Sequence, residues 1–124
     1  MKKTTLALLL LVFVGCHREE AAAVKAVLTK GDGNVEAGKA ENEKYGCNAC
    51  HIIPRIEGQR GMAGPSLEHL KSRPLLSGKL PNNPAIVTKW MQNPPAMDPQ
   101  SAMPNLGVTP DDARDITAYL FAQP

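Results

Sequence analysis

The chain has 124 residues, which gives it room for one domain. Of its 14 basic residues, Lys2 and Lys3 stand in a leader that we expect to be removed, so 12 basic residues remain against 12 acidic ones. This balance excludes the strongly basic face of a nucleic-acid-binding protein, and we expect no nucleic-acid partner.

The first 15 residues have the pattern of a secretory signal. After the basic start comes an apolar run from Leu6 to Val14, which is too short to remain in a bilayer as a spanning helix. Gly15-Cys16 then resembles the lipobox of bacterial lipoproteins, in which the cysteine becomes the acylated first residue, although Phe13 stands where that motif usually has leucine. The alternative is that Cys16 is a small apolar residue within the signal. We expect residues 1–15 to be a lipoprotein signal peptide and Cys16 to carry the lipid.

Residues 16–33 are interpreted as the lipidated N-terminus and a linker, and residues 34–124 as one domain. From Gly31 to Pro124 only 16 of 94 residues are Leu, Ile, Val or Phe, beside 11 prolines and 9 glycines. That apolar content is below the level at which a chain usually builds its own core. Either the domain is disordered, or a group outside the sequence fills its interior.

Three helices are predicted, each with a capping residue before its apolar positions: Asn34, Asn83 and Thr109. The first, over 34–46, should run into the motif that follows it. Pro84 and Pro110 suit the first helical position of the other two, and Pro94-Pro95 should end the second. Long proline-rich loops without a strand pattern join them, so the sequence predicts an all-α domain.

Residues 47–51 read Cys-Asn-Ala-Cys-His, the attachment pattern for c-type haem. Each thiol adds to a vinyl group of the porphyrin and the adjacent imidazole ligates the iron. We therefore expect Cys47 and Cys50 to anchor one covalent haem and His51 to be its proximal ligand. A structural zinc needs about four ligands, and the domain adds only His69. A redox disulfide belongs beside a βαβ pattern, which is not visible.

The haem iron needs a second axial ligand or an open site, and five residues could supply one: Met62, Met91, Met97, Met103 and His69. Met103 is predicted, because it lies in a loop just before the last helix, where a thioether can point back at the iron. Met97 is a weaker candidate. His69 would give a bis-histidine site, but charged neighbours indicate a solvent face. Any single methionine could also simply fill the core.

The CNACH motif together with AMPNLGVTPDDARDITAYL resembles the class I monohaem c-type cytochromes over residues 34–122. More narrowly, it is similar to bacterial members that occur beside respiratory terminal oxidases. The resemblance implies a cytochrome c fold with three to five helices and long loops wrapped around one haem. Histidine and methionine ligands are implied as well.

The resemblance also implies further site residues. In Gly64-Pro65-Ser66-Leu67 the Pro65 carbonyl would accept the Nδ1–H of the haem histidine, which fixes the ring tautomer. Trp90 and Arg73 would hold the haem propionates, with Arg60 as a competing partner. The alternatives are a core tryptophan and a solvated arginine.

One departure concerns the first helix. Members of this group usually carry apolar residues five and six positions before the first haem cysteine, and here Asn42 and Glu41 stand there. We expect a less apolar contact with the last helix and therefore lower stability.

A six-coordinate iron has no vacant position for a substrate, so we expect an electron carrier rather than an enzyme. It would be an exported protein with a monomeric head, lipid-anchored in the periplasm or on the outer face of a bacterial membrane. It would pass electrons from a respiratory donor complex to a terminal oxidase. The alternative is a haem-based sensor or small-ligand-binding module with a displaceable methionine. A peroxidase is a third reading, but no convincing distal acid/base set is visible.

Overall fold

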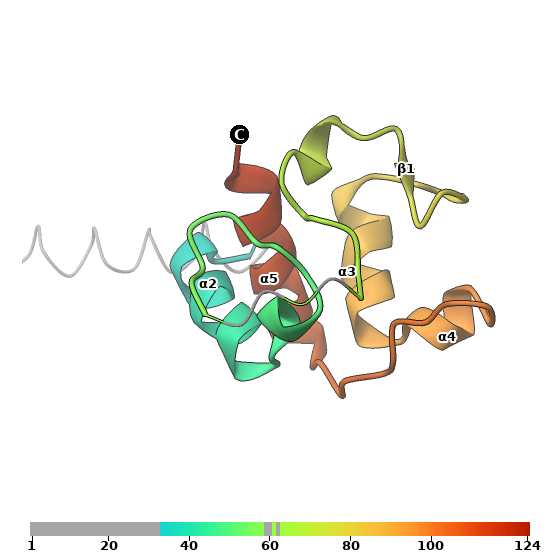
Figure 1. Ribbon diagram of the computed structural model, residues 1–124, viewed down its shortest axis with the longest axis horizontal. Coiled ribbons are helices and arrows are strands. Elements are labelled where there is room, and N and C mark those ends of the chain that lie inside the picture. The colour runs from blue at the N-terminus through green and yellow to red at the C-terminus, as the bar shows by residue number, and fades with distance from the viewer. Residues whose placement is uncertain (1–32, 59–60, 62) are drawn as a thin grey trace, which may run out of the picture. The chain divides into compact units, whose positions relative to one another are not determined.

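The computed structural model describes residues 33–58, 61 and 63–124. The predicted signal peptide, nearly all of the linker, Arg60 and Met62 lie outside the described residues. All described residues belong to one unit, Asp32–Pro124. Its elements, shown in Figure 1, are α2 (Val35–Lys44), η1 (Cys47–Ala49), η2 (Leu70–Ser72), β1 (Leu75–Leu76), β2 (Leu80–Pro81), α3 (Pro84–Gln92), α4 (Pro94–Met97) and α5 (Pro110–Ala122).

The three predicted helices are present as α2, α3 and α5. Their caps are also as predicted, because the side chains of Asn34, Asn83 and Thr109 each accept hydrogen bonds from backbone N–H groups of the first turn. The expectation that the first helix runs into the CNACH motif is wrong. Helix α2 ends at Lys44, since Gly46 takes a left-handed conformation (φ 67°), and the motif begins in the separate 3₁₀ turn η1.

Two short features are absent from the sequence prediction. Pro94-Pro95 do end α3, but they also occupy the first positions of the single-turn helix α4. Strands β1 and β2 form a small antiparallel hairpin in which Leu76 pairs with Leu80. Each element is too short for a periodic pattern to appear.

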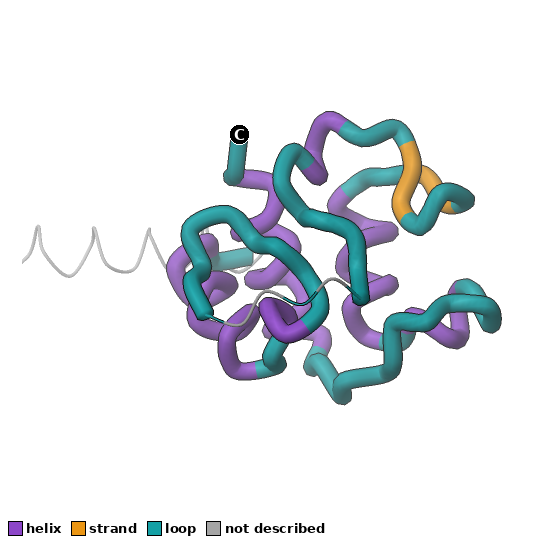
Figure 2. The backbone as a smooth tube through the Cα atoms, in the orientation of Figure 1, coloured by secondary structure: helices purple, strands orange, loops and turns teal. Residues whose placement is uncertain are grey.

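The described part of the chain is mainly helices and long loops, which the tube of Figure 2 shows in purple and teal. The expected mainly helical architecture with long loops is therefore confirmed, with four α-helices among the described residues. None of the helices in this part has the length and apolar character needed to cross a membrane.

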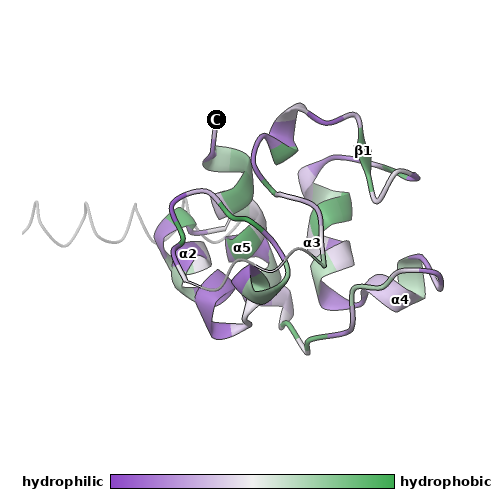
Figure 3. Ribbon diagram, in the orientation of Figure 1, coloured by the Kyte–Doolittle hydropathy of each residue, from purple (hydrophilic) through white to green (hydrophobic). Residues whose placement is uncertain are grey.

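The helix contacts centre on α5, which packs most extensively on α2 and then on α3. Its inner face, with Ala113, Ile116 and Leu120, is almost fully buried. By contrast, the buried residues of α2 are Gly38 and Asn42, and Figure 3 shows much of this helix as hydrophilic. A Cβ at Gly38 would overlap the backbone carbonyl of Asp115, so the close approach of the two helices needs glycine there.

Polar groups fill much of the rest of the α2–α5 contact. Asp112 accepts hydrogen bonds from Lys44 Nζ at 2.8 Å and from Tyr45 Oη at 2.6 Å. These two donors lower the pKa of Asp112 to about 2. Burial, followed by the charges of Asp112 and Asp115, raises the pKa of Glu41 to about 7. The expected departure from an apolar contact is present in the structure.

Candidate functional site

A cavity of about 670 Å³ lies between the CNACH segment, the hairpin and the loop before α5, and its lining is mainly apolar. Its size is in the range of small-molecule and cofactor pockets. All seven residues that the sequence assigned to the cofactor line it: Cys47, Cys50, His51, Pro65, Arg73, Trp90 and Met103. Segments far apart in the sequence thus converge on one space with the donor set that haem c requires.

The two cysteines are presented by η1 and the turn after it. His51 N–H donates to Cys47 O at 3.0 Å, so one helical turn separates the first thiol from the imidazole. Cys47 is 8% exposed, whereas Cys50 is exposed, and the two thiols are not joined in a disulfide. Burial raises the pKa of the Cys47 thiol. Redox-active thiols usually have a lowered pKa, and Cys47 does not have this property.

His51 is oriented by the segment that follows it. Its Nδ1 lies 2.6 Å from the carbonyl oxygen of Pro65, the contact that the resemblance implies. Because a carbonyl can only accept, Nδ1 carries the proton and Nε2 keeps its lone pair for a metal. A Cβ at Gly64 would overlap the imidazole ring, so glycine is required there for the ring to lie as it does.

Arg73 also stabilises this segment. Its guanidinium donates to the carbonyl oxygens of Ser66 at 2.6 Å and Glu68 at 2.8 Å. It therefore fixes the backbone directly after Pro65. Its role toward a propionate remains a prediction.

Trp90, in α3, also lines the cavity, and only 6% of its surface is exposed. Its indole N–H donates to the sulfur of Met103 at 3.2 Å. A thioether sulfur has two lone pairs, so this bond leaves one for a metal. The indole thus has a partner other than the predicted propionate, and the propionate role is untested.

The other candidates for the second iron ligand are placed less favourably than Met103. Met91 lines the cavity, but its position in α3 is 7% exposed and packed in the core. Met97 packs against the core and is not among the lining residues, and His69 is exposed and also outside the lining. The described residues contain no group of three or more His, Cys, Asp or Glu side chains that could hold a metal ion, which disfavours zinc there.

Sequence reasoning missed six polar residues of the cavity wall: Asn42, Ser77, Lys79, Asp98, Gln100 and Ser101. Asn42 donates to Gly38 O at 2.8 Å, while its Oδ1 is buried without a hydrogen-bond partner among the described residues. Asn42 lies four residues after Gly38, on the same face of α2, and this helical spacing could have suggested that it is buried. Lys79 and Asp98 lie in short turns, where no sequence signal brings them together.

Helices and long loops around an apolar cavity, with a Cys-x-x-Cys-His segment and a loop methionine in its wall, define a domain that attaches haem covalently. The family model for cytochrome c matches residues 14–122, so the chain belongs to the cytochrome c family. Members of this family carry covalently bound haem c and transfer electrons. The comparison with curated proteins gave no match.

Proposed function

We propose that the protein is a lipid-anchored electron carrier with one haem c, linked to Cys47 and Cys50, and with His51 and Met103 as axial ligands. The observation that supports this best is the cavity, which both thiols, the imidazole and the thioether line together. A haem with two protein ligands has no vacant position for a substrate. One electron then enters from a donor and leaves to an acceptor.

Haem would supply the one-electron couple between ferric and ferrous iron, and the chain supplies its surroundings. His51, held by Pro65, would be the basic ligand on one side. Met103 would be a soft ligand that favours ferrous iron and raises the reduction potential above that of a bis-histidine site. The apolar lining of the cavity limits access of water, which acts in the same direction.

We further propose that acylated Cys16 anchors the protein in the periplasm or on the outer face of a bacterial membrane. The lipobox-like Gly15-Cys16 after an apolar run supports this. The proposed donor is a quinol-oxidising complex and the proposed acceptor a terminal oxidase. The resemblance of the CNACH and AMPNLGV segments to cytochromes found beside such oxidases supports the acceptor.

The ligation is tested by absorption spectra of the protein made in a host that attaches haem. We expect a Met-to-iron charge-transfer band in the ferric form, its loss in Met103→Ala, and its retention in Met97→Ala, a matched truncation outside the cavity lining. A band that survives in Met103→Ala would contradict Met103 as the ligand. Rapid carbon monoxide binding to the ferrous wild type would favour the sensor alternative.

The partner proposal is tested separately by stopped-flow oxidation of the reduced protein with membranes that contain an active terminal oxidase. We expect oxidation that depends on the oxidase and is inhibited with it. A haem that stays reduced beside the working oxidase would overturn the acceptor assignment. Cys16→Ser should release the protein from the membrane without changing its spectrum.

A further inference from the structure

The segment from Asp98 to Val108 carries Met103 and is shaped mostly by its own turns. Asp98 Oδ1 accepts from Gln100 N–H at 3.1 Å, and Asp98 O accepts from Ser101 N–H at 2.9 Å. Ser101 Oγ in turn accepts from Met103 N–H at 3.1 Å. Short-range hydrogen bonds therefore link Asp98 to Gln100 and Ser101, and Ser101 to the backbone of Met103.

This segment has few polar links to the rest of the domain. Among the described residues, only two side chains from outside it and α4 form hydrogen bonds with it: Lys79 and Trp90. Trp90 contacts the Met103 sulfur itself. At the base of the loop, the Asp98 N–H donates to Pro94 O of α4 at 2.9 Å, and Lys79 is the side chain from outside α4 that bonds there among the described residues. Val108, 6% exposed, anchors its far end in the core.

Lys79 comes from a rigid element. Ser77 and Gly78 both have positive φ angles, and Lys79 N–H donates to Leu76 O at 3.1 Å, which closes a tight turn. Asn82 then fastens the end of the hairpin, because its side chain donates to the carbonyls of Leu70 and Arg73. The amine is thus presented from a fixed support.

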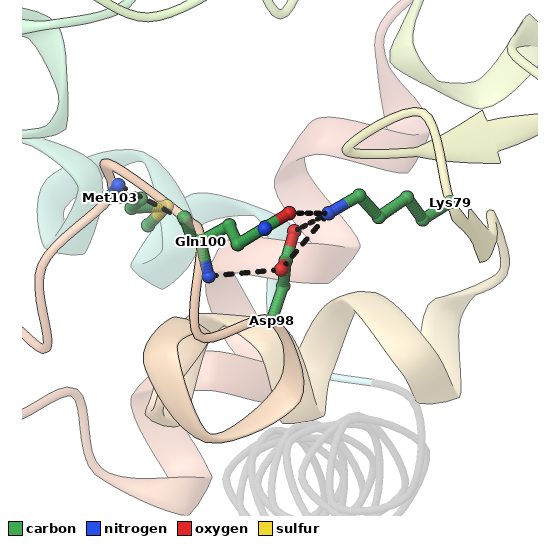
Figure 4. Close-up of polar contacts among 5 residues, drawn as sticks. Lys79, Asp98, Gln100 and Met103 are labelled. Carbon is green, nitrogen blue, oxygen red and sulfur yellow. Dashed lines mark hydrogen bonds and ion pairs between the residues drawn. The ribbon is translucent and has the colours of Figure 1, made fainter.

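The Lys79 amine contacts both carboxylate oxygens of Asp98 and the side-chain oxygen of Gln100. Lys79 Nζ lies 3.1 and 3.0 Å from the two carboxylate oxygens of Asp98 and 3.1 Å from Gln100 Oε1 (Figure 4). The Asp98 side chain is only 10% exposed, so water weakens the pair less than a surface ion pair. Hydrogen bonds from Lys79 and then from the Gln100 N–H hold the pKa of Asp98 below its usual range.

We infer that Lys79 and Asp98 are positioning residues for the methionine ligand: their ion pair fastens the 98–108 loop to the hairpin across the mouth of the haem cavity and keeps Met103 on the iron. The inference rests on the proposed function for the role of Met103. It gives the chain a way to set how readily the methionine dissociates, independently of overall stability.

The test uses the full-length haem-loaded protein in its ferrous form. Lys79→Met removes the charge at similar volume, and Asp98→Asn removes the other charge but keeps an acceptor for the Gln100 N–H. Lys79→Arg is the conservative rescue. Lys44→Met is the matched control, since Lys44 and Asp112 form an ion pair of similar exposure between α2 and α5, away from the loop.

Two quantities are measured: the rate of carbon monoxide binding and amide hydrogen exchange in 98–108. Lys79→Met and Asp98→Asn should each raise both by roughly three- to tenfold, the loss expected for one charge-assisted contact. Lys79→Arg should stay within about twofold of wild type because it retains the charge. Lys44→Met should change neither quantity.

Equal rates in wild type, Lys79→Met and Asp98→Asn would overturn the inference. So would an equal rise in Lys44→Met, because the effect would then be general destabilisation. If the wild type lacks the Met-to-iron band, the proposed ligation fails, and the exchange comparison still decides whether the ion pair holds the loop.

Discussion

The two sides of the haem cavity are built in different ways. On one side, α2 and α5 cross closely at Gly38, and the buried face of α5 gives that region an apolar core. On the other side, the Met103 loop has its own turns but few links to its surroundings within the described part of the chain. The first region is specified by the polypeptide, whereas the second depends on side-chain contacts and on the group that fills the cavity.

If His51 and Met103 bind the iron as we propose, the chain combines a firmly held ligand with one that can be released. His51 belongs to the fixed side, where the Pro65 carbonyl and Gly64 define the position of its ring. Met103 belongs to a loop that few side-chain hydrogen bonds join to the helices within the described residues, and we expect it to open without their unfolding. The free energy of local opening is lowest where few buried contacts hold a segment.

The largest effect should come from Cys47→Ala/Cys50→Ala. Without covalent attachment the cavity of about 670 Å³ has no permanent occupant, and the chain has too few large apolar residues to close it. We expect a protein without covalent haem whose helical circular dichroism is mostly lost at room temperature. Cys16→Ser, which lies outside the domain, should keep both the haem and the helices. A double variant that unfolds like wild type would show that the polypeptide suffices.

The helix crossing is tested by Gly38→Ala. The added methyl group overlaps the Asp115 carbonyl, so α2 must move away from α5. We expect the free energy of unfolding to fall by about 1–3 kcal/mol in urea titrations. Lys39→Ala, exposed on the same helix, should change it by less than about 0.5 kcal/mol. Equal effects of the two substitutions would contradict the close crossing.

The polar part of this contact predicts a dependence on pH. The pKa of Glu41 rises from 4.5 to about 7 in the folded state, so folding favours its protonated form. The free energy of unfolding should therefore fall as pH rises from about 4.5 to 7, by about 1–2 kcal/mol after allowance for partial exposure. Glu41→Gln should abolish this slope and be more stable than wild type at pH 8.

The pKa of Asp112 shifts in the opposite direction, so its effect on stability provides an internal comparison for Glu41. Its pKa falls from 3.8 to about 2, so its stabilising effect is present above 3.8 and is lost as pH falls toward 2. The loss of stability below pH 3.8 should remain in Glu41→Gln. Unfolding curves at a series of pH values measure both limbs, and an unchanged slope between pH 5 and 7 in Glu41→Gln would rule out Glu41 as its source.

The smallest predicted effect concerns Trp90→Phe. The indole N–H draws electron density from the Met103 sulfur, which would make the thioether a weaker donor to ferric iron in the proposed ligation. Removing one such hydrogen bond should lower the reduction potential by roughly 20–60 mV. Redox titration measures this, with Trp90→Phe compared against wild type under the same buffer. A rise in potential would contradict the direction of the effect.

Much of the fold was predictable because its signals are local. Asn34, Asn83 and Thr109 cap the helices within three residues of their own positions, and proline supports two of the three starts. The end of α2 was not predictable in the same way. Gly46 could have continued the helix toward the motif, and its left-handed conformation is known only from the folded chain.

The same distinction between local signals and tertiary contacts applies to the site. The CNACH motif and the Met103 loop carry their chemistry in adjacent residues, so the sequence indicated two of the segments that line the cavity. The Lys79–Asp98 pair joins a two-residue-strand hairpin to the end of a single-turn helix, and neither element has a readable period. Trp90 was predicted at the site, but its contact with Met103 depends on tertiary packing.

The central claim is that a haem bonded to Cys47 and Cys50 forms the interior that the polypeptide lacks. The intact mass of the purified, denatured protein tests it most directly, because only a covalent group survives denaturation. The account predicts the mass of the mature chain with its lipid plus a single haem. A colourless protein with the mass of polypeptide and lipid alone would contradict it.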